Sequence, residues 1–155
     1  MRTFFLVLAA LLTLPALAQS GQLYENARFG YSLSVPDGFA GQDEAENGDG
    51  QQFVVPGRAI GLTVWGGLAG DFEQEVAAHL SQDTAAGWNR GDEAVTPRWA
   101  SWSSSRGGQI AYQRMIALCD GQSYAAVRAE YGLRDRAEMD PLVEQLVASL
   151  RGGTC

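Results

Sequence analysis

The segment DEAENGDG, residues 43–50, has the density of carboxylates and glycines that calcium loops have. A calcium loop needs oxygen-bearing side chains at its first, third and fifth positions and a glutamate at its twelfth. Counting from Asp43 places Ala45 third and Val54 twelfth, so this spacing fails. The segment is therefore interpreted as a turn that leads into a hairpin. A looser cation site at Asp43, Glu46 and Asp49 remains the alternative.

His79 is the only histidine, so a serine or cysteine triad would have to use it. It lies beside Leu80 at the edge of the apolar stripe of a predicted helix, with no nucleophile next to it, which favours a structural role. The chain contains no lysine, which excludes a phosphate-loop lysine, a Schiff-base lysine and a serine-lysine dyad. The remaining catalytic hypothesis is a small envelope hydrolase that uses the carboxylates of residues 43–49, assisted by Arg114 or His79.

Arg114 is predicted to lie on an apolar face of a sheet, where an unpaired charge is costly. Its partner is either a carboxylate, such as Glu130 or Asp71, or an anionic ligand. In the second case Tyr112, Tyr131 and a tryptophan would line the pocket. These three residues, Arg114, Tyr112 and Tyr131, form the candidate ligand site.

The elements that position this site centre on the dipeptide Asp120-Gly121, a strong hairpin signal between the apolar runs 108–119 and 122–131. A two-residue turn pairs Cys119 with Gln122 and fixes which side chains share a face. One face then carries Ile110, Tyr112, Ile116, Leu118, Val127 and Tyr131, and the other carries Met115, Ala117, Cys119, Tyr124 and Ala126. Because both faces are largely apolar, the hairpin is predicted to be central and covered on both sides by helices.

Further elements follow from periodicity. Alternation predicts a half-buried strand over 29–35 and a hairpin over 51–65, and one or two short strands are expected over 94–102. Asp71 and Gln74 are placed to cap a helix that ends near Gly87. A last helix is predicted to begin with Asp140 as its cap and Pro141 in its first turn. The fold class is α+β, with an antiparallel sheet flanked by helices.

Residues 1–18 carry one positive charge, an apolar run and an Ala-Leu-Ala end, which is typical of a cleavable secretory signal. The mature chain, residues 19–155, is then expected to be one domain in the periplasm or outside the cell, without a membrane anchor. Loss of Arg2 leaves ten arginines against eighteen carboxylates, which argues against nucleic acid as a partner. No cofactor is expected.

Cys119 and Cys155 are the only cysteines, and an exported protein meets an oxidising compartment. We predict that they form a disulfide that holds the C-terminal tail. A redox-active pair is the alternative, but the spacing lacks the Cys-x-x-Cys pattern.

The runs YENARFGYSLSVPDGF, NGDGQQF, AEYG and MDPLVEQLVASLR resemble a group of uncharacterised exported proteins of alphaproteobacteria. That resemblance implies a PsbP-like fold, an antiparallel sheet with helices on both faces in an α/β/α sandwich, and brings no established activity. PsbP-like domains are generally non-catalytic accessory modules, so the resemblance implies a binding role, with an envelope protein as the expected partner.

Overall fold

A central hairpin organises the molecule, and its register is the one that the sequence predicts. In the computed structural model, which describes residues 21–154, β8 (Gln109–Ala117) pairs antiparallel with β9 (Ser123–Gly132), with Ala117 opposite Tyr124. The Asp120 carboxylate accepts hydrogen bonds from the backbone N–H groups of Gln122 and Ser123 at 2.9 and 2.8 Å. Gly121 has a φ of 67°, which glycine adopts without strain. The turn thus fixes the pairing.

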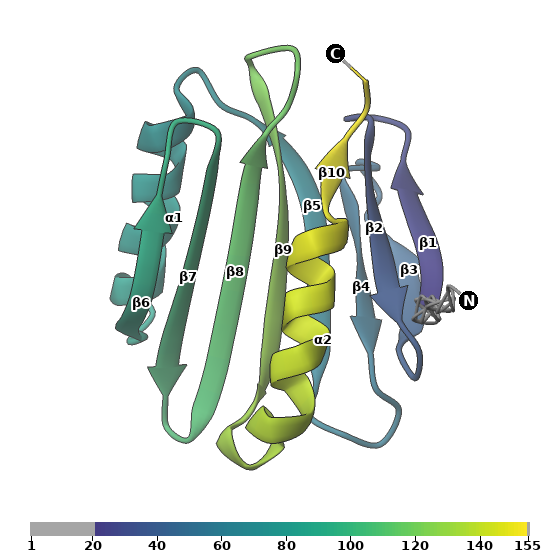
Figure 1. Cartoon of the computed structure of the whole chain (residues 1–155), viewed down its shortest axis with the longest axis vertical. Coiled ribbons are helices and arrows are strands. Elements are labelled where there is room, and N and C mark those ends of the chain that lie inside the picture. Colours follow the sequence, from purple (N-terminus) through teal and green to yellow (C-terminus); the bar gives the residue numbers. More distant parts are fainter. Residues whose placement is uncertain (1–20, 155) are drawn as a thin grey trace, which may run out of the picture.

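The hairpin lies inside a seven-stranded sheet, and a small three-stranded sheet packs over one face of this sheet at its β3-β4-β5 end (Figure 1). The large sheet has the order β3-β4-β5-β9-β8-β7-β6, and the small one has the order β1-β2-β10. All strand pairs are antiparallel. The remaining strands are β1 (Gly21–Asn26), β2 (Tyr31–Pro36), β3 (Ala40–Glu44), β4 (Gly50–Val54), β5 (Gly61–Leu68), β6 (Asn89–Val95), β7 (Trp99–Arg106) and β10 (Arg151–Gly152).

Two helices pack on the large sheet, one on each face. Alternate residues of β9 separate the two cores: Val127 lies in one core with Val143 and Leu146 of α2 (Arg136–Ser149), and Ala126 lies in the other with Leu80 of α1 (Phe72–Ala85). The small sheet shares the α2 core through Tyr31, Leu33 and Val35. The α+β class with antiparallel sheets is confirmed. A full layer of helices on each face is not, because within the described residues each face carries a single α-helix.

Helix α1 follows the sequence prediction at both ends. The Asp71 carboxylate accepts a hydrogen bond from the Gln74 N–H at 2.8 Å, and the helix stops at Ala85, two residues before Gly87. A carboxylate at this position satisfies a donor that the first helical turn leaves unpaired.

The predicted start of α2 is wrong. The helix begins at Arg136 after a short 3₁₀ turn, Leu133–Asp135, so Pro141 lies inside it. Met139 is buried in the core, and Glu138 binds Arg58 at 2.7 Å. These tertiary contacts hold the extra turn in place, although Pro141 has no N–H to donate to the backbone of that turn.

Every residue of the two edge strands of the large sheet, β3 and β6, is exposed, and each strand has a register shift. Strand β3 was not predicted, because its residues are the polar start of the acidic segment. Charged, irregular edges discourage pairing with other chains.

Candidate functional site

A groove opens beside α2, where the helix leaves part of the large sheet uncovered. In Figure 1 the yellow α2 crosses in front of β9, while no helix of residues 21–154 lies in front of β6, β7 and β8. The groove has a volume of about 1010 Å³, and α2 forms one of its walls. A second hollow, lined by residues of β4, β5 and β9, is smaller, at about 140 Å³.

The groove has an aromatic and apolar floor and a hydroxyl-bearing side. Tyr112 and Ile110 of β8 and Tyr131 of β9 form the floor, since Ile110 pairs with Tyr131 and Tyr112 follows on the same face. Every second residue of β7 adds a hydroxyl group, from Ser101, Ser103 and Ser105. Such a surface offers both contact area and hydrogen-bonding groups to a ligand.

Tyr131 is a hydrogen-bonding group here and not a base. Burial, reinforced by the negative charge of Asp140, raises the pKa of its phenol above the ordinary value. The side chain therefore stays neutral near pH 7, and its hydroxyl group can donate to a ligand.

Arg114 is not itself a lining residue, but it contacts Ser101, which lines one end of the groove, and it follows Tyr112 on the same face of β8. Its Nη1 donates to the Ser101 Oγ at 2.9 Å, and its guanidinium lies 4.2 Å from the centre of the Trp99 ring. Its Nε is buried and has no hydrogen-bond partner within residues 21–154. Burial lowers the pKa of Arg114, which means that the protein environment disfavours this charge.

Neither carboxylate predicted as a partner contacts Arg114. Glu130 binds Arg128 at 2.7 Å, and both project from the other face of β9, while Asp71 caps α1. Arg114 therefore lies beside Tyr112 and Trp99, with no carboxylate of the described residues paired to it. Tyr131 is on the same face but farther along the hairpin, opposite Ile110.

The acidic segment forms the connection between β3 and β4. Asn26 donates to the Gly48 carbonyl at 2.9 Å, and Tyr31 donates to the Asp49 carbonyl at 2.8 Å, so the small sheet fastens this turn. The Asp49 carboxylate accepts from Asn47 at 2.7 Å. Within residues 21–154, no three histidine, cysteine, aspartate or glutamate side chains gather as a metal site, Asp43, Glu46 and Asp49 included.

His79 lies on the α1 face, away from the groove. Its Nε2 is 3.3 Å from the Glu75 carboxylate and 3.3 Å from the Tyr124 hydroxyl, and its ring lies 5.8 Å from that of Trp65. Burial lowers the pKa of His79, and the nearby charges of Glu75 and Asp83 offset this only in part. The contacts join α1 to the sheet, as a structural histidine would.

This lowered pKa predicts a pH effect on stability. Protonation of His79 is less favourable in the folded chain than in the unfolded chain. The contribution of neutral His79 to the stability of the fold is therefore complete above the unfolded pKa of 6.5, and it falls as the pH drops below that value. Thermal unfolding should therefore show a lower Tm at pH 5 than at pH 8, with a smaller difference in His79→Gln. Asp120 and Glu138 also have lowered pKa values, but their ordinary values of 3.8 and 4.5 place their effect at more acidic pH. An unchanged pH profile in the variant would contradict the assignment.

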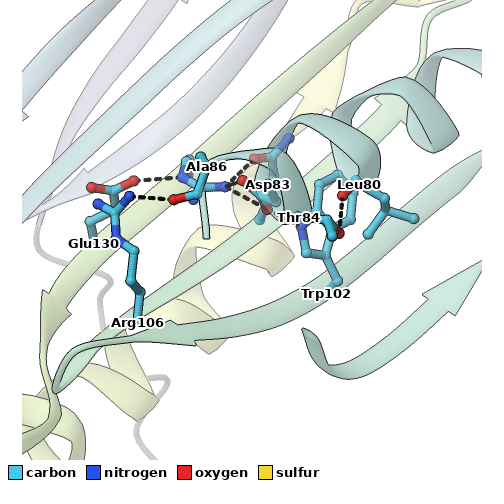
Figure 2. A network of polar contacts seen from close by, with 9 residues as sticks. Leu80, Asp83, Thr84, Ala86, Trp102, Arg106 and Glu130 are labelled. Carbon is cyan, nitrogen blue, oxygen red and sulfur yellow. Dashed lines mark hydrogen bonds and ion pairs between the residues drawn. The ribbon is translucent and has the colours of Figure 1, made fainter. Parts of the chain in front are cut away.

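A buried polar network, which was not predicted from the sequence, holds the end of α1 against the sheet (Figure 2). The Asp83 carboxylate accepts from the indole N–H of Trp102 at 2.9 Å and from Arg128 at 3.0 Å. Arg128 also donates to Gln113 at 2.9 Å and to Glu130 at 2.7 Å. Burial lowers the pKa of Arg128, but the bonds to Asp83 and Glu130 outweigh it and raise the pKa above the ordinary value. Asp83 continues the spacing of Val76 and Leu80, which is the signal that could have revealed its burial.

Cys119 lies just before the Asp120-Gly121 turn, and its sulfur is 3.4 Å from the carbonyl oxygen of Gly153. Cys155 and the predicted signal, residues 1–18, lie outside the described residues, so the disulfide and the signal remain predictions. No helix within residues 21–154 is long and apolar enough to cross a membrane.

Comparison with solved structures places this arrangement of sheets and helices among known folds. The chain is similar to cyanobacterial PsbP (CyanoP) from Synechocystis sp. PCC 6803, with a TM-score of 0.64 and 10% identity over 91% of this chain and 98% of that one. The fold is PsbP/Mog1-like. The Ran-binding protein Mog1p of Saccharomyces cerevisiae matches with a TM-score of 0.62 and 11% identity, over 87% of this chain and 96% of its own.

The PsbP/Mog1-like fold is shared without detectable sequence kinship. No protein-family model matches the sequence, and no curated protein is similar to it. At 10% and 11% sequence identity, the structural similarity shows the fold alone. The function must therefore be argued from the groove and side chains of this chain.

Proposed function

We propose that the chain is an exported, non-catalytic binding domain whose ligand occupies the groove beside α2. The observation that carries the proposal is Arg114, a half-buried cation that contacts the Ser101 end of a groove of about 1010 Å³ and has no carboxylate partner among residues 21–154. Tyr112 and Tyr131 would supply the ligand-facing floor. Export to the periplasm is supported by the signal-like pattern of residues 1–18 and by the resemblance to exported alphaproteobacterial proteins.

A binding role is favoured over hydrolysis by where the reactive groups lie. The groove contains hydroxyl groups but no histidine, since His79 lies on the opposite face. The carboxylates of residues 43–49 line no part of the groove either, so they share no cleft with Arg114. The yeast neighbour is named as a Ran-binding protein, which supports the idea that this scaffold can serve protein recognition.

The proposal predicts that Arg114→Met abolishes binding while the fold keeps its stability. The stacking on Trp99 and the bond to Ser101 each contribute about 1 kcal/mol, and the variant removes an unpaired, partly buried charge that offsets them. The free energy of unfolding, measured with urea, should change by less than about 1 kcal/mol. Arg128→Met is the matched control on the same hairpin, because its arginine has two carboxylate partners and its loss should destabilise clearly.

Binding itself is tested by cross-linking the mature protein to its ligand in intact periplasm and comparing variants. We expect capture by the wild type and by Arg134→Gln, whose side chain is 86% exposed, and loss of capture in Arg114→Met and Tyr131→Ala. Capture that is equal in all four proteins would place the ligand elsewhere. Hydrolysis of an envelope substrate that is lost in His79→Gln would overturn the non-catalytic role.

A further inference from the structure

The walls of the groove carry negative charge on both sides. Strand β6 contributes Asp92, and α2 contributes Asp140 and Glu144. Glu93 also borders the groove, but it pairs with Trp102, so its side chain lies on the α1 face of the sheet. Arg136 pairs with Asp140 at 3.6 Å and Arg90 pairs with Glu93 at 3.5 Å, whereas within residues 21–154 Asp92 and Glu144 have no ion-pair partner. A ligand between these walls meets a negative field.

The end of the groove beside Ser101 has the opposite charge. Arg114 donates to Ser101, which itself lines the groove, and it has no carboxylate of the described residues beside it. The groove is therefore polarised along its length, with one cation at the end and carboxylates beyond it. A polyanionic glycan would be repelled by the walls, and a simple cation would leave Arg114 unused. A ligand with one negative end and a positive body fits both features.

The dimensions suit a short piece of extended polypeptide. The lining of β7 from Ser101 to Ser105 spans four residues, or roughly 13 Å. The lining of α2 from Arg136 to Ala148 spans twelve residues, or roughly 18 Å. This length holds about four to five extended residues, at a rise of roughly 3.3 Å each. The floor of Tyr112 and Tyr131 can receive an apolar side chain.

We propose that the groove binds the C-terminal end of a partner polypeptide, with its terminal carboxylate on Arg114 and a lysine or arginine side chain between the acidic walls. The planar guanidinium suits a carboxylate, because it can donate two parallel hydrogen bonds. A partner peptide whose C-terminus lies at Arg114 supplies its terminal carboxylate as the missing counter-ion. Because the peptide ends there, the groove does not have to continue beyond Arg114. This inference rests on the proposed function and specifies its ligand.

The probe is a synthetic mixture of N-acetylated pentapeptides with lysine at the third position, alanine, leucine or tyrosine at the others, and a free C-terminus. Titration into ¹⁵N-labelled mature protein should shift the backbone signals of Tyr112, Tyr131 and Glu144 and the Nε–Hε signal of Arg114. The C-terminal amide of the same mixture, and a mixture with glutamate in place of lysine, should each bind at least tenfold more weakly. Binding should weaken as salt is raised.

Two variants test which residues of the protein recognise the terminal carboxylate and the lysine of the peptide. Arg114→Met should remove the preference for the free carboxylate, and Glu144→Gln should reduce the preference for lysine over glutamate. Glu73→Gln, an exposed change on α1 at the other face of the sheet, should alter neither. Equal binding of acid and amide mixtures, or of lysine and glutamate mixtures, would overturn the inference. If no peptide binds but cross-linking in periplasm still depends on Arg114, the inference fails and the proposed function stands; if that dependence is also absent, both fail.

Discussion

Replacing Asp83 with alanine is expected to lower the free energy of unfolding by about 3–5 kcal/mol, since a buried ion pair then loses one partner. The Asp83 and Arg128 side chains are only 12% and 14% exposed, so water cannot replace the lost carboxylate well. The Trp102 indole N–H, on a fully buried ring, would also lose its acceptor. Urea unfolding followed by circular dichroism measures the change. A loss of this size is a large part of the total stability of a small domain, which is typically 5–15 kcal/mol.

A graded series separates charge from hydrogen bonding. Asp83→Asn keeps an acceptor for Trp102 but removes the charge, so it should lower the free energy of unfolding less than Asp83→Ala does. Trp102→Phe removes one hydrogen bond and should lower the free energy of unfolding by about 1 kcal/mol. Gln82→Ala is the control, because Gln82 is exposed in the same turn of α1. If Asp83→Ala costs no more than Gln82→Ala, the network does not anchor the helix.

The central hairpin shows how much local sequence can determine. The Asp120-Gly121 turn sets the pairing of β8 with β9, and the alternation of strand side chains then assigns each residue to a face. Tyr112 and Tyr131 were thereby placed together, on the face that also carries Arg114. The cap of α1 was predictable for the same reason, since Asp71 and Gln74 interact within one turn.

Features that depend on contacts between distant segments were not predictable. The start of α2 was misplaced because Arg58, far away in the sequence, binds Asp135 and Glu138 and holds a turn that local signals assign to a loop. Asp83 was overlooked because a carboxylate in an apolar stripe makes sense only once Arg128 is known to face it. The candidate site was likewise predictable only in part. Its residues could be assigned to a face, but the groove exists because α2 covers only part of that face.

The Cys119–Cys155 disulfide is expected to make the second large contribution to stability. Closing a loop of about 36 residues should stabilise the fold by about 4 kcal/mol in the chain-entropy model. The position of Cys119 supports the pairing, because its sulfur lies 3.4 Å from the Gly153 carbonyl oxygen, two residues before Cys155. Strand β10 would depend on the bond, since it pairs with β2 through only Arg151 and Gly152.

Variants of the two cysteines test the pairing through non-additivity. Cys119→Ser, Cys155→Ser and the double variant should each lose about 4 kcal/mol, because either change breaks the same bond, and the wild type should match them under reducing conditions. Amide exchange should quicken at Gly153, whose N–H donates to the Gly30 carbonyl at 2.7 Å, because the tail is then free to leave the small sheet. Two reactive thiols in the denatured, unreduced protein would contradict the bond, and additive losses in the single variants would show that each cysteine stabilises the fold independently.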